Sequence, residues 1–193
     1  MSRFAQVMCR SAPWRLFAGR VVLPWALQGR ELHGDVLEIG CGSGAMAAEI
    51  LRRHPDVRLT ATDFDESMVE VARRRLAPFG PRAEVRRADA TALPFPDATF
   101  DAAVSFIMLH HVVGWEQALG ELVRVLRPGG LLLGYDLLAD RGGHLLHGRE
   151  HEVRLMRRAE LEQRLGELAA DEAQIRPSFG GTVARFAARR APA

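Results

Sequence analysis

The chain has 193 residues, of which 48% are hydrophobic and 26% charged, a balance typical of a soluble globular protein with one substantial core rather than two domains. Its 26 Lys and Arg residues against 24 Asp and Glu residues give a net charge of only +2, so the sequence lacks the basic excess of a nucleic-acid binder. Two widely separated cysteines, and an apolar run at 21–27 that is too short to span a bilayer, lead us to expect a cytoplasmic protein without a membrane span.

Short β-type runs alternate with amphipathic helical stretches along the chain. This alternation predicts an α/β fold of the Rossmann-like, doubly wound kind, with a mostly parallel sheet covered by helices on both faces. Residues 171–177 and 182–188 fit an antiparallel C-terminal hairpin around Gly180-Gly181. The expected parallel strands span 35–39, 57–62, 83–87, 100–107 and 131–137.

Helices are expected at 45–53 and at 158–169. A third helix is expected to begin after Asp65, which is a suitable N-cap. A further helix should follow the fourth strand and end at Pro128-Gly129-Gly130. One apolar stripe defines that helix, and it consists of Trp115, Ala118, Leu119, Leu122 and Leu126.

The domain organisation is expected to be simple, with one domain over 1–193. Within it, 1–33 should form a helical segment that packs on the sheet, and 137–157 a substrate-side insert. Pro94 and Pro96 leave room for only a loop between the third and fourth strands.

A glycine-rich turn, Gly40-x-Gly42-x-Gly44, follows the first strand and precedes a helix. Glycines let a ligand approach the backbone, and the helix N-terminus supplies oriented N–H groups. Asp63 lies about 20 residues further on, where a carboxylate accepts hydrogen bonds from ribose hydroxyls. The run from Gly40 to Ala45 also satisfies the looser dinucleotide pattern, so an NAD(P)-binding oxidoreductase is an alternative on these residues alone.

Three segments together resemble the class I (Rossmann-like) S-adenosylmethionine-dependent methyltransferases of the small-molecule type. The first reads VLEIGCGSG at 36–44 and is similar to that family's first motif, including the acid before the glycines. The second reads ADA at 88–90, with LPFPD and FDAAVS after it, and resembles the adenine-contacting segment and fourth strand. The third reads LRPGGLLL at 126–133 and resembles the turn before the fifth strand.

The resemblance implies S-adenosylmethionine as cofactor and assigns its binding residues. Glu38 would orient the turn and the cofactor's amino group, and Asp63 would hold the ribose hydroxyls. Asp89 would accept from the adenine amine beside the Ala90 amide. Phe64 would press against the adenine and Phe106 would lie near the methionine end, although plain core packing is an alternative for both rings. The turn itself contributes Gly40, Cys41, Gly42 and Gly44, where Cys41 is expected to be a small buried thiol and not a nucleophile.

The methyl acceptor is expected to be a small molecule, because the N-terminal segment and the 137–157 insert are both short. Methyl transfer needs alignment more than acid–base chemistry. His110 and His111 are the best-placed bases, and of these we retain His110, with a structural role as the alternative, since no carboxylate is evident beside either ring in the sequence. No metal site is expected, since the spacing of His144, His147 and His151 fits no standard ligand pattern.

One further alternative remains at this point. A module that binds S-adenosylmethionine without catalysis would carry the same turn. The protein is expected to be a monomer or a homodimer, and the sequence does not identify the acceptor.

Overall fold

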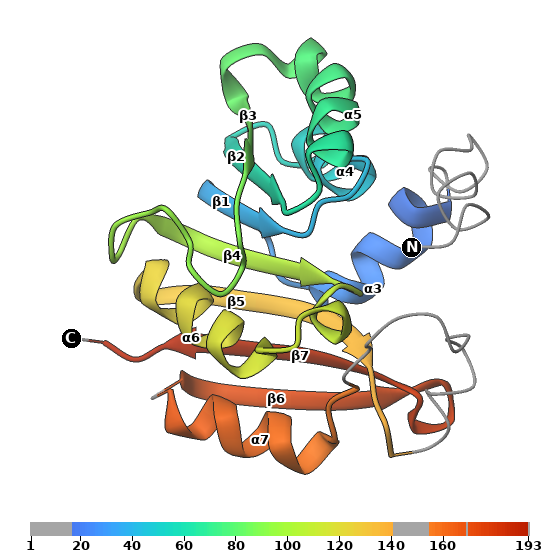
Figure 1. Ribbon diagram of the computed structural model, residues 1–193, viewed down its shortest axis with the longest axis vertical. Helices are drawn as coiled ribbons and strands as arrows, with labels where there is room; N and C mark the ends of the chain where they lie inside the picture. The colour runs from blue at the N-terminus through green and yellow to red at the C-terminus, as the bar shows by residue number, and fades with distance from the viewer. Residues whose placement is uncertain (1–16, 141–154, 169, 193) are drawn as a thin grey trace.

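The computed structural model describes residues 17–140, 155–168 and 170–192 (Figure 1). Seven strands form one sheet in the order β3-β2-β1-β4-β5-β7-β6. Strands β1 to β5 pair in parallel, whereas β7 is antiparallel to both β5 and β6. The Rossmann-like sheet and its antiparallel C-terminal hairpin are therefore confirmed. The strands are β1 (Gly34–Ile39), β2 (Val57–Asp63), β3 (Ala83–Arg87), β4 (Phe100–Phe106), β5 (Leu126–Leu137), β6 (Ala170–Ser178) and β7 (Val183–Arg190).

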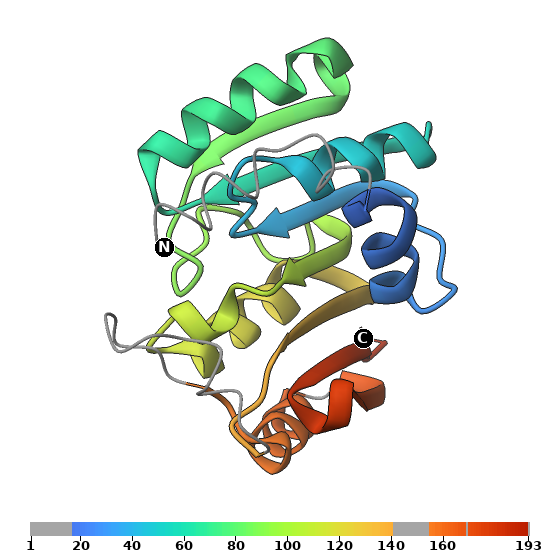
Figure 2. The ribbon, with the colours of Figure 1, turned by 90° about the vertical axis from the view of Figure 1, so that its right-hand side faces the viewer.

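Helices cover both faces of the sheet, and Figure 2 shows α3 and α6 on opposite sides of it. One core lies under α3, α4 and α5, and the other lies under α6 and α7. In the described part of the chain, no helix combines the length and the apolar character that crossing a membrane requires. The helices are a π-helix η1 (Ala18–Val22), α3 (Leu23–Leu27), α4 (Ala45–Arg53), α5 (Glu66–Leu76), α6 (Trp115–Val125), α7 (Arg158–Glu167), and the 3-10 helices η2 (Ala77–Arg82), η3 (Leu109–His111) and η5 (Phe179–Gly181).

Helix α5 begins where the sequence predicts. The Asp65 side chain accepts a hydrogen bond from the Ser67 amide at 2.8 Å, as an N-cap does. Of the segments expected outside the sheet, residues 1–16 and most of the 137–157 insert lie outside the described residues.

The predicted apolar stripe of α6 is wrong at its last residue, Leu126, which lies in β5. Helix α6 ends at Val125, and Leu126 has extended backbone (φ −71°, ψ 143°) and pairs with Phe100 as the first residue of β5. The residue before a proline avoids the helical region, so Arg127-Pro128 stops the helix early. A register shift between Phe100 and Ala102 then accommodates Pro128-Gly129-Gly130. Leu126 is buried as predicted, but in the sheet.

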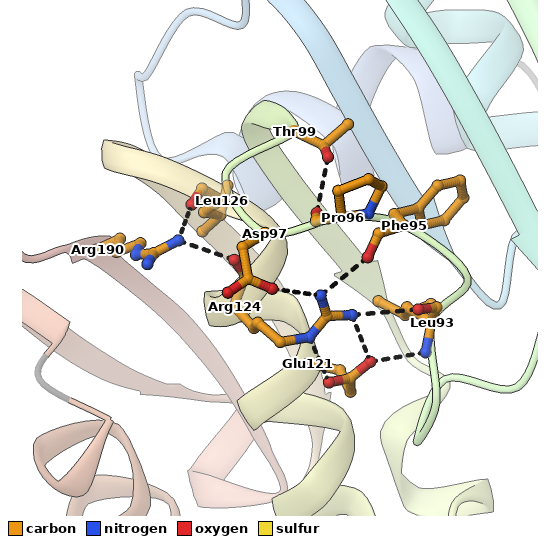
Figure 3. A network of polar contacts seen from close by, with 9 residues as sticks. All are labelled: Leu93, Phe95, Pro96, Asp97, Thr99, Glu121, Arg124, Leu126 and Arg190. Atoms are coloured by element: carbon orange, nitrogen blue, oxygen red, sulfur yellow. Dashed lines mark hydrogen bonds and ion pairs between the residues drawn. The ribbon is translucent and has the colours of Figure 1, made fainter.

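A side chain of α6 holds the loop between β3 and β4 (Figure 3). Residues 88–99 of this loop are all described, and none of them is helical, as predicted. The Arg124 guanidinium donates to the carbonyls of Leu93 and Phe95 at 3.1 and 2.9 Å, and it pairs with Asp97 at 2.7 Å. Glu121 completes the arrangement by accepting from the Leu93 amide at 2.7 Å. Because this loop forms no helix, its backbone groups lack helical partners, and α6 satisfies three of them.

Candidate functional site

The carboxyl ends of β1, β2, β4 and β5 meet at one edge of the sheet, the edge that faces the viewer in Figure 2. The chain builds the sheet outward from β1 through β2 to β3, and then starts again on the other side of β1 with β4. In open α/β sheets, ligands bind outside the strand ends at such a switch point. The glycine turn follows β1 here, and Asp63 ends β2.

The three glycines of the turn have different surroundings. All have positive φ, between 52° and 72°. A Cβ atom at Gly40 would lie 2.7 Å from the Met108 side chain, and one at Gly44 would lie 3.2 Å from the Ala72 Cβ, whereas one at Gly42 would have no described atom within 4 Å. Gly40 and Gly44 therefore allow close packing, and Gly42 is the glycine that faces open space.

Asp63 lies directly beside the turn. Its Oδ2 accepts a hydrogen bond from the Gly42 amide at 2.7 Å, and its Oδ1 accepts from the Asp65 amide at 3.0 Å. The helix cap is therefore provided by Asp65, and the Asp63 carboxylate joins the end of β2 to the turn. This arrangement puts a carboxylate where a ribose is predicted to bind.

Glu38 is a buried carboxyl group that lacks a partner for one oxygen. The residue is 2% exposed, and its Oε2 has no hydrogen bond. Burial, followed by the nearby Asp63 carboxylate, raises the pKa of Glu38 from 4.5 to about 8. A buried acid in this state is stabilised by any cationic donor that reaches it, and the ammonium group of S-adenosylmethionine is such a donor. The residues present therefore fit the cofactor.

Cys41 fits its predicted role as a buried thiol. It is 7% exposed, and burial, together with Glu38 and Asp63, raises the pKa of its thiol well above the ordinary value. The thiolate is the reactive form of cysteine, so this environment disfavours a nucleophile.

The two phenylalanines that are predicted to contact the cofactor differ in their exposure to solvent. Phe64 is 65% exposed, and the Arg87 guanidinium lies 5.4 Å from its ring centroid. It is therefore not a core residue, and its ring is available to an adenine. Phe106 is 6% exposed and packs in the core, with its ring centroid 5.7 Å from that of Tyr135.

Asp89 and Ala90 lie in the loop after β3. Asp89 is exposed, and its Oδ1 accepts from the amide and the hydroxyl of Thr91 at 2.8 and 2.7 Å. Ala90 packs against the core under α6. Gln117 of α6 donates to the carbonyl of Thr91 at 3.0 Å, so α6 contacts the residue that binds the Asp89 side chain.

The structure places a carboxylate beside His110, which the sequence analysis missed. His110 Nδ1 lies 2.5 Å from Asp136 Oδ1, and both residues are buried. Asp136 also accepts from the amides of Leu109 and Leu137, each at 2.7 Å. Because β4 and β5 are parallel neighbours, the residues after β4 meet the end of β5, and this adjacency was the signal available in the sequence.

His111 differs from its neighbour. It is exposed, and its ring centroid lies 4.0 Å from that of His110. Residues His144, His147 and His151 lie outside the described residues. Within the described ranges, no group of three His, Cys, Asp or Glu side chains is arranged to hold a metal ion.

Comparison with known proteins agrees with this geometry. Residues 36–130 match a family described as a methyltransferase domain. The chain is 39% identical over 98 residues to a demethylmenaquinone methyltransferase of Thermus thermophilus, an alignment that covers 51% of this chain and 44% of that protein. It is 40% identical over 120 residues to a demethylmenaquinone methyltransferase of Clavibacter sepedonicus, which covers 62% of this chain and 45% of that protein. The matched part thus spans less than half the length of either relative.

Solved structures share the fold at low sequence identity. The PH0226 protein from Pyrococcus horikoshii superposes with a TM-score of 0.80 at 18% identity, over 98% of this chain and 99% of that one. The [4+2]-cyclase SpnF superposes with a TM-score of 0.79 at 20% identity, over 95% of this chain and 84% of that one. These two likenesses establish the fold alone.

The two neighbouring aspartates allow a matched test of the ribose site. Asp63→Ala is expected to weaken S-adenosylmethionine binding, because each charge-assisted hydrogen bond lost costs on the order of 1.5–3 kcal/mol. Asp65→Ala removes the helix cap and is expected to lower the free energy of unfolding by about 0.5–2 kcal/mol with cofactor affinity unchanged. Titration calorimetry and urea unfolding of both variants measure the difference. Equal affinity of Asp63→Ala and the parent protein would show that the ribose site is misassigned.

Glu38 predicts a pH dependence of cofactor binding. Because its pKa in the ligand-free protein is about 8, Glu38 is mainly protonated at pH 6, and a bound ammonium group favours the ionised form. S-adenosylmethionine affinity is therefore expected to rise between pH 6 and 7.5, by up to about tenfold per pH unit, with release of a proton. Calorimetry in buffers of different ionisation enthalpy measures the protons released. Glu38→Gln should bind more weakly and with a flat pH profile; a parent profile equally flat contradicts the assignment.

Proposed function

We propose that this protein, whose residues 36–130 match a family described as a methyltransferase domain, transfers a methyl group from S-adenosylmethionine to a small-molecule acceptor. One observation carries the proposal: the buried Glu38 carboxyl, whose Oε2 has no hydrogen bond, comes two residues before a glycine turn that Asp63 joins to the neighbouring strand. An NAD(P)-dependent oxidoreductase is not favoured, since the similar sequences are methyltransferases.

We further propose that the acceptor is a quinol-type aromatic ring. Two relatives bear the name demethylmenaquinone methyltransferase, and a third is the ubiquinone/menaquinone biosynthesis C-methyltransferase UbiE of Geobacter sulfurreducens, at 40% identity over 100 residues. That third alignment covers 50% of this chain and 39% of the relative. A cytoplasmic location and a monomeric or dimeric state remain predictions from the sequence.

Methyl transfer requires mainly that the methyl donor and the acceptor are aligned. S-adenosylmethionine, when bound, supplies an electrophilic methyl group on a sulfonium centre. The residues at the strand ends hold the two reactants in line, and such positioning is worth about 7–11 kcal/mol of the barrier. Burial of Cys41 raises the pKa of its thiol, so the turn does not present a competing thiolate to the methyl group.

The proposed function is tested in two steps. Titration calorimetry is expected to detect S-adenosylmethionine and its demethylated product but neither NAD(P) nor FAD. Incubation with reduced quinols and with amine, hydroxyl and thiol acceptors is then followed by release of the demethylated product. Tight binding of a nicotinamide cofactor overturns the proposal. Good cofactor affinity with no turnover on any acceptor favours a binding module, or another chemistry on the same fold.

We propose His110 as the base that removes the acceptor's proton. Its Nδ1 faces the Asp136 carboxylate at 2.5 Å, so the proton is assigned to Nδ1 and the lone pair to Nε2. Asp136 is itself fixed by two backbone amides, and it therefore fixes the orientation of the ring. The same contacts also join η3 to the end of β5, so His110 has a structural role in addition.

His110→Ala is expected to lower the turnover rate roughly 10²–10⁴-fold while S-adenosylmethionine affinity changes little, because a general base acts only in the chemical step. Asp136→Asn should lower the rate in the same direction by disturbing the tautomer of His110. His111→Ala is the matched control and should retain the parent rate. Full turnover by a folded His110→Ala variant would leave His110 with a structural role only. Circular dichroism and thermal melting establish whether each variant is folded.

A further inference from the structure

Two exposed apolar residues have an unfavourable backbone conformation at the edge of the sheet that holds the candidate site. Ile107 is 44% exposed and Phe179 is 73% exposed. Both also have left-handed backbone, with φ of +50°. Among the described residues, six large hydrophobic side chains are exposed, and only these two combine exposure with a left-handed backbone.

This backbone conformation is unfavourable for such residues. A residue with a Cβ atom pays about 1–2 kcal/mol in the left-handed region, and a β-branched residue such as Ile107 is a genuine outlier there. Their exposed apolar surface also forgoes the stabilisation that burial would give. Gly or Asn would suit both positions better for folding alone, so the side chains themselves are the feature that needs an explanation.

Ile107 lies between the cofactor turn and the end of β5. It follows Phe106, the last residue of β4, and its amide donates to the Tyr135 carbonyl at 2.8 Å. The next residue, Met108, packs against Gly40 of the turn. Ile107 therefore lies beside the turn that is predicted to hold the methyl donor.

Phe179 lies on the other side of the end of β5. It begins the turn between β6 and β7, and its ring centroid is 5.7 Å from that of Trp25 on α3. Trp25 in turn lies 5.2 Å from Tyr135, the residue whose carbonyl binds Ile107. Ring contacts through Trp25 thus link Phe179 to Tyr135, the residue that binds the Ile107 amide (Figure 1 shows α3 and the β6–β7 turn on the side where β5 ends).

We propose that Ile107 and Phe179 are apolar walls of the acceptor site and that they set its preference for acceptors with a hydrocarbon substituent. The proposal rests on the methyltransferase function proposed above. Contact with a hydrocarbon group would remove both side chains from water, and this gain offsets the cost of holding them in place. The site would thus recognise the acceptor's substituent as well as the atom that receives the methyl group.

The test measures binding without turnover. The protein is saturated with the demethylated cofactor product, and calorimetry compares 1-naphthol with a hexyl-substituted 1-naphthol. The parent protein is expected to prefer the hexyl probe. Ile107→Gly and Phe179→Gly should each weaken binding of the hexyl probe about tenfold, as loss of one hydrophobic contact does, and leave 1-naphthol binding unchanged. Ile107→Asn, which tolerates the left-handed backbone, repeats the measurement if the glycine variant does not fold.

Ala98 provides the matched control. It has a φ of +54° and is exposed, but it lies before β4, at the opposite edge of the sheet. Ala98→Gly should raise the melting temperature by about 2–4 °C through relief of backbone strain, with both naphthols bound as in the parent. Phe179→Gly should not lower the melting temperature, since its ring is mostly exposed.

The outcomes separate the two proposals. If the parent binds the two probes equally, or if the wall variants keep the parent's preference, the assignment of Ile107 and Phe179 is overturned, whether or not the protein methylates an acceptor. It is also overturned if the variants lose affinity for the cofactor product in equal measure. If the preference depends on both residues while no acceptor is ever methylated, the apolar walls are supported and the methyl-transfer function fails.

Discussion

The parallel pairing of β1 with β2 on one side and β4 on the other is the constraint on which the site depends. It aligns Ile39 with Thr62 and with Ser105, so that three strands end at the same level. The turn after β1, the carboxylate at the end of β2 and the loop after β4 therefore meet without any long connection between them. The Gly42 amide then bonds Asp63, which fixes the turn to the neighbouring strand. A disturbance of this pairing would move every predicted cofactor contact at once.

Much of this arrangement follows from local sequence signals. The helix over 45–53 and the strand over 83–87 have the bounds that the sequence predicts, and Asp65 caps α5 as expected. These features depend on neighbours in the chain: a glycine turn, an acceptor side chain before a helix, or an apolar alternation. The segment from β1 to β4 was also supported by its resemblance to known methyltransferases, which fixed the order of its motifs.

The features that the sequence analysis missed depend on contacts between distant segments. The pairing of His110 with Asp136 joins residues 26 apart, and no local pattern marks it. Leu126 has the spacing of the α6 stripe, but Pro128 disfavours helical backbone at Arg127, so the helix ends before Leu126. Leu126 is buried in the sheet instead. The left-handed backbone of Ile107 is likewise invisible in the sequence, because isoleucine is a residue type that normally avoids it. Tertiary structure decides each of these cases.

The hydrogen bonds around α6 affect the order in which the parts of the site can form while the chain is being synthesised. Arg124 holds the loop that begins at the predicted adenine contact, and the Arg124 carbonyl is in turn bound by Arg190 of β7, 66 residues further along the chain. Arg190 also binds the Leu126 carbonyl at the start of β5. During synthesis the glycine turn and Asp63 therefore emerge well before the residue that secures the end of α6 and, through it, the loop that begins at the predicted adenine contact. A nascent chain would have the predicted ribose side of the site long before the predicted adenine side is fully secured.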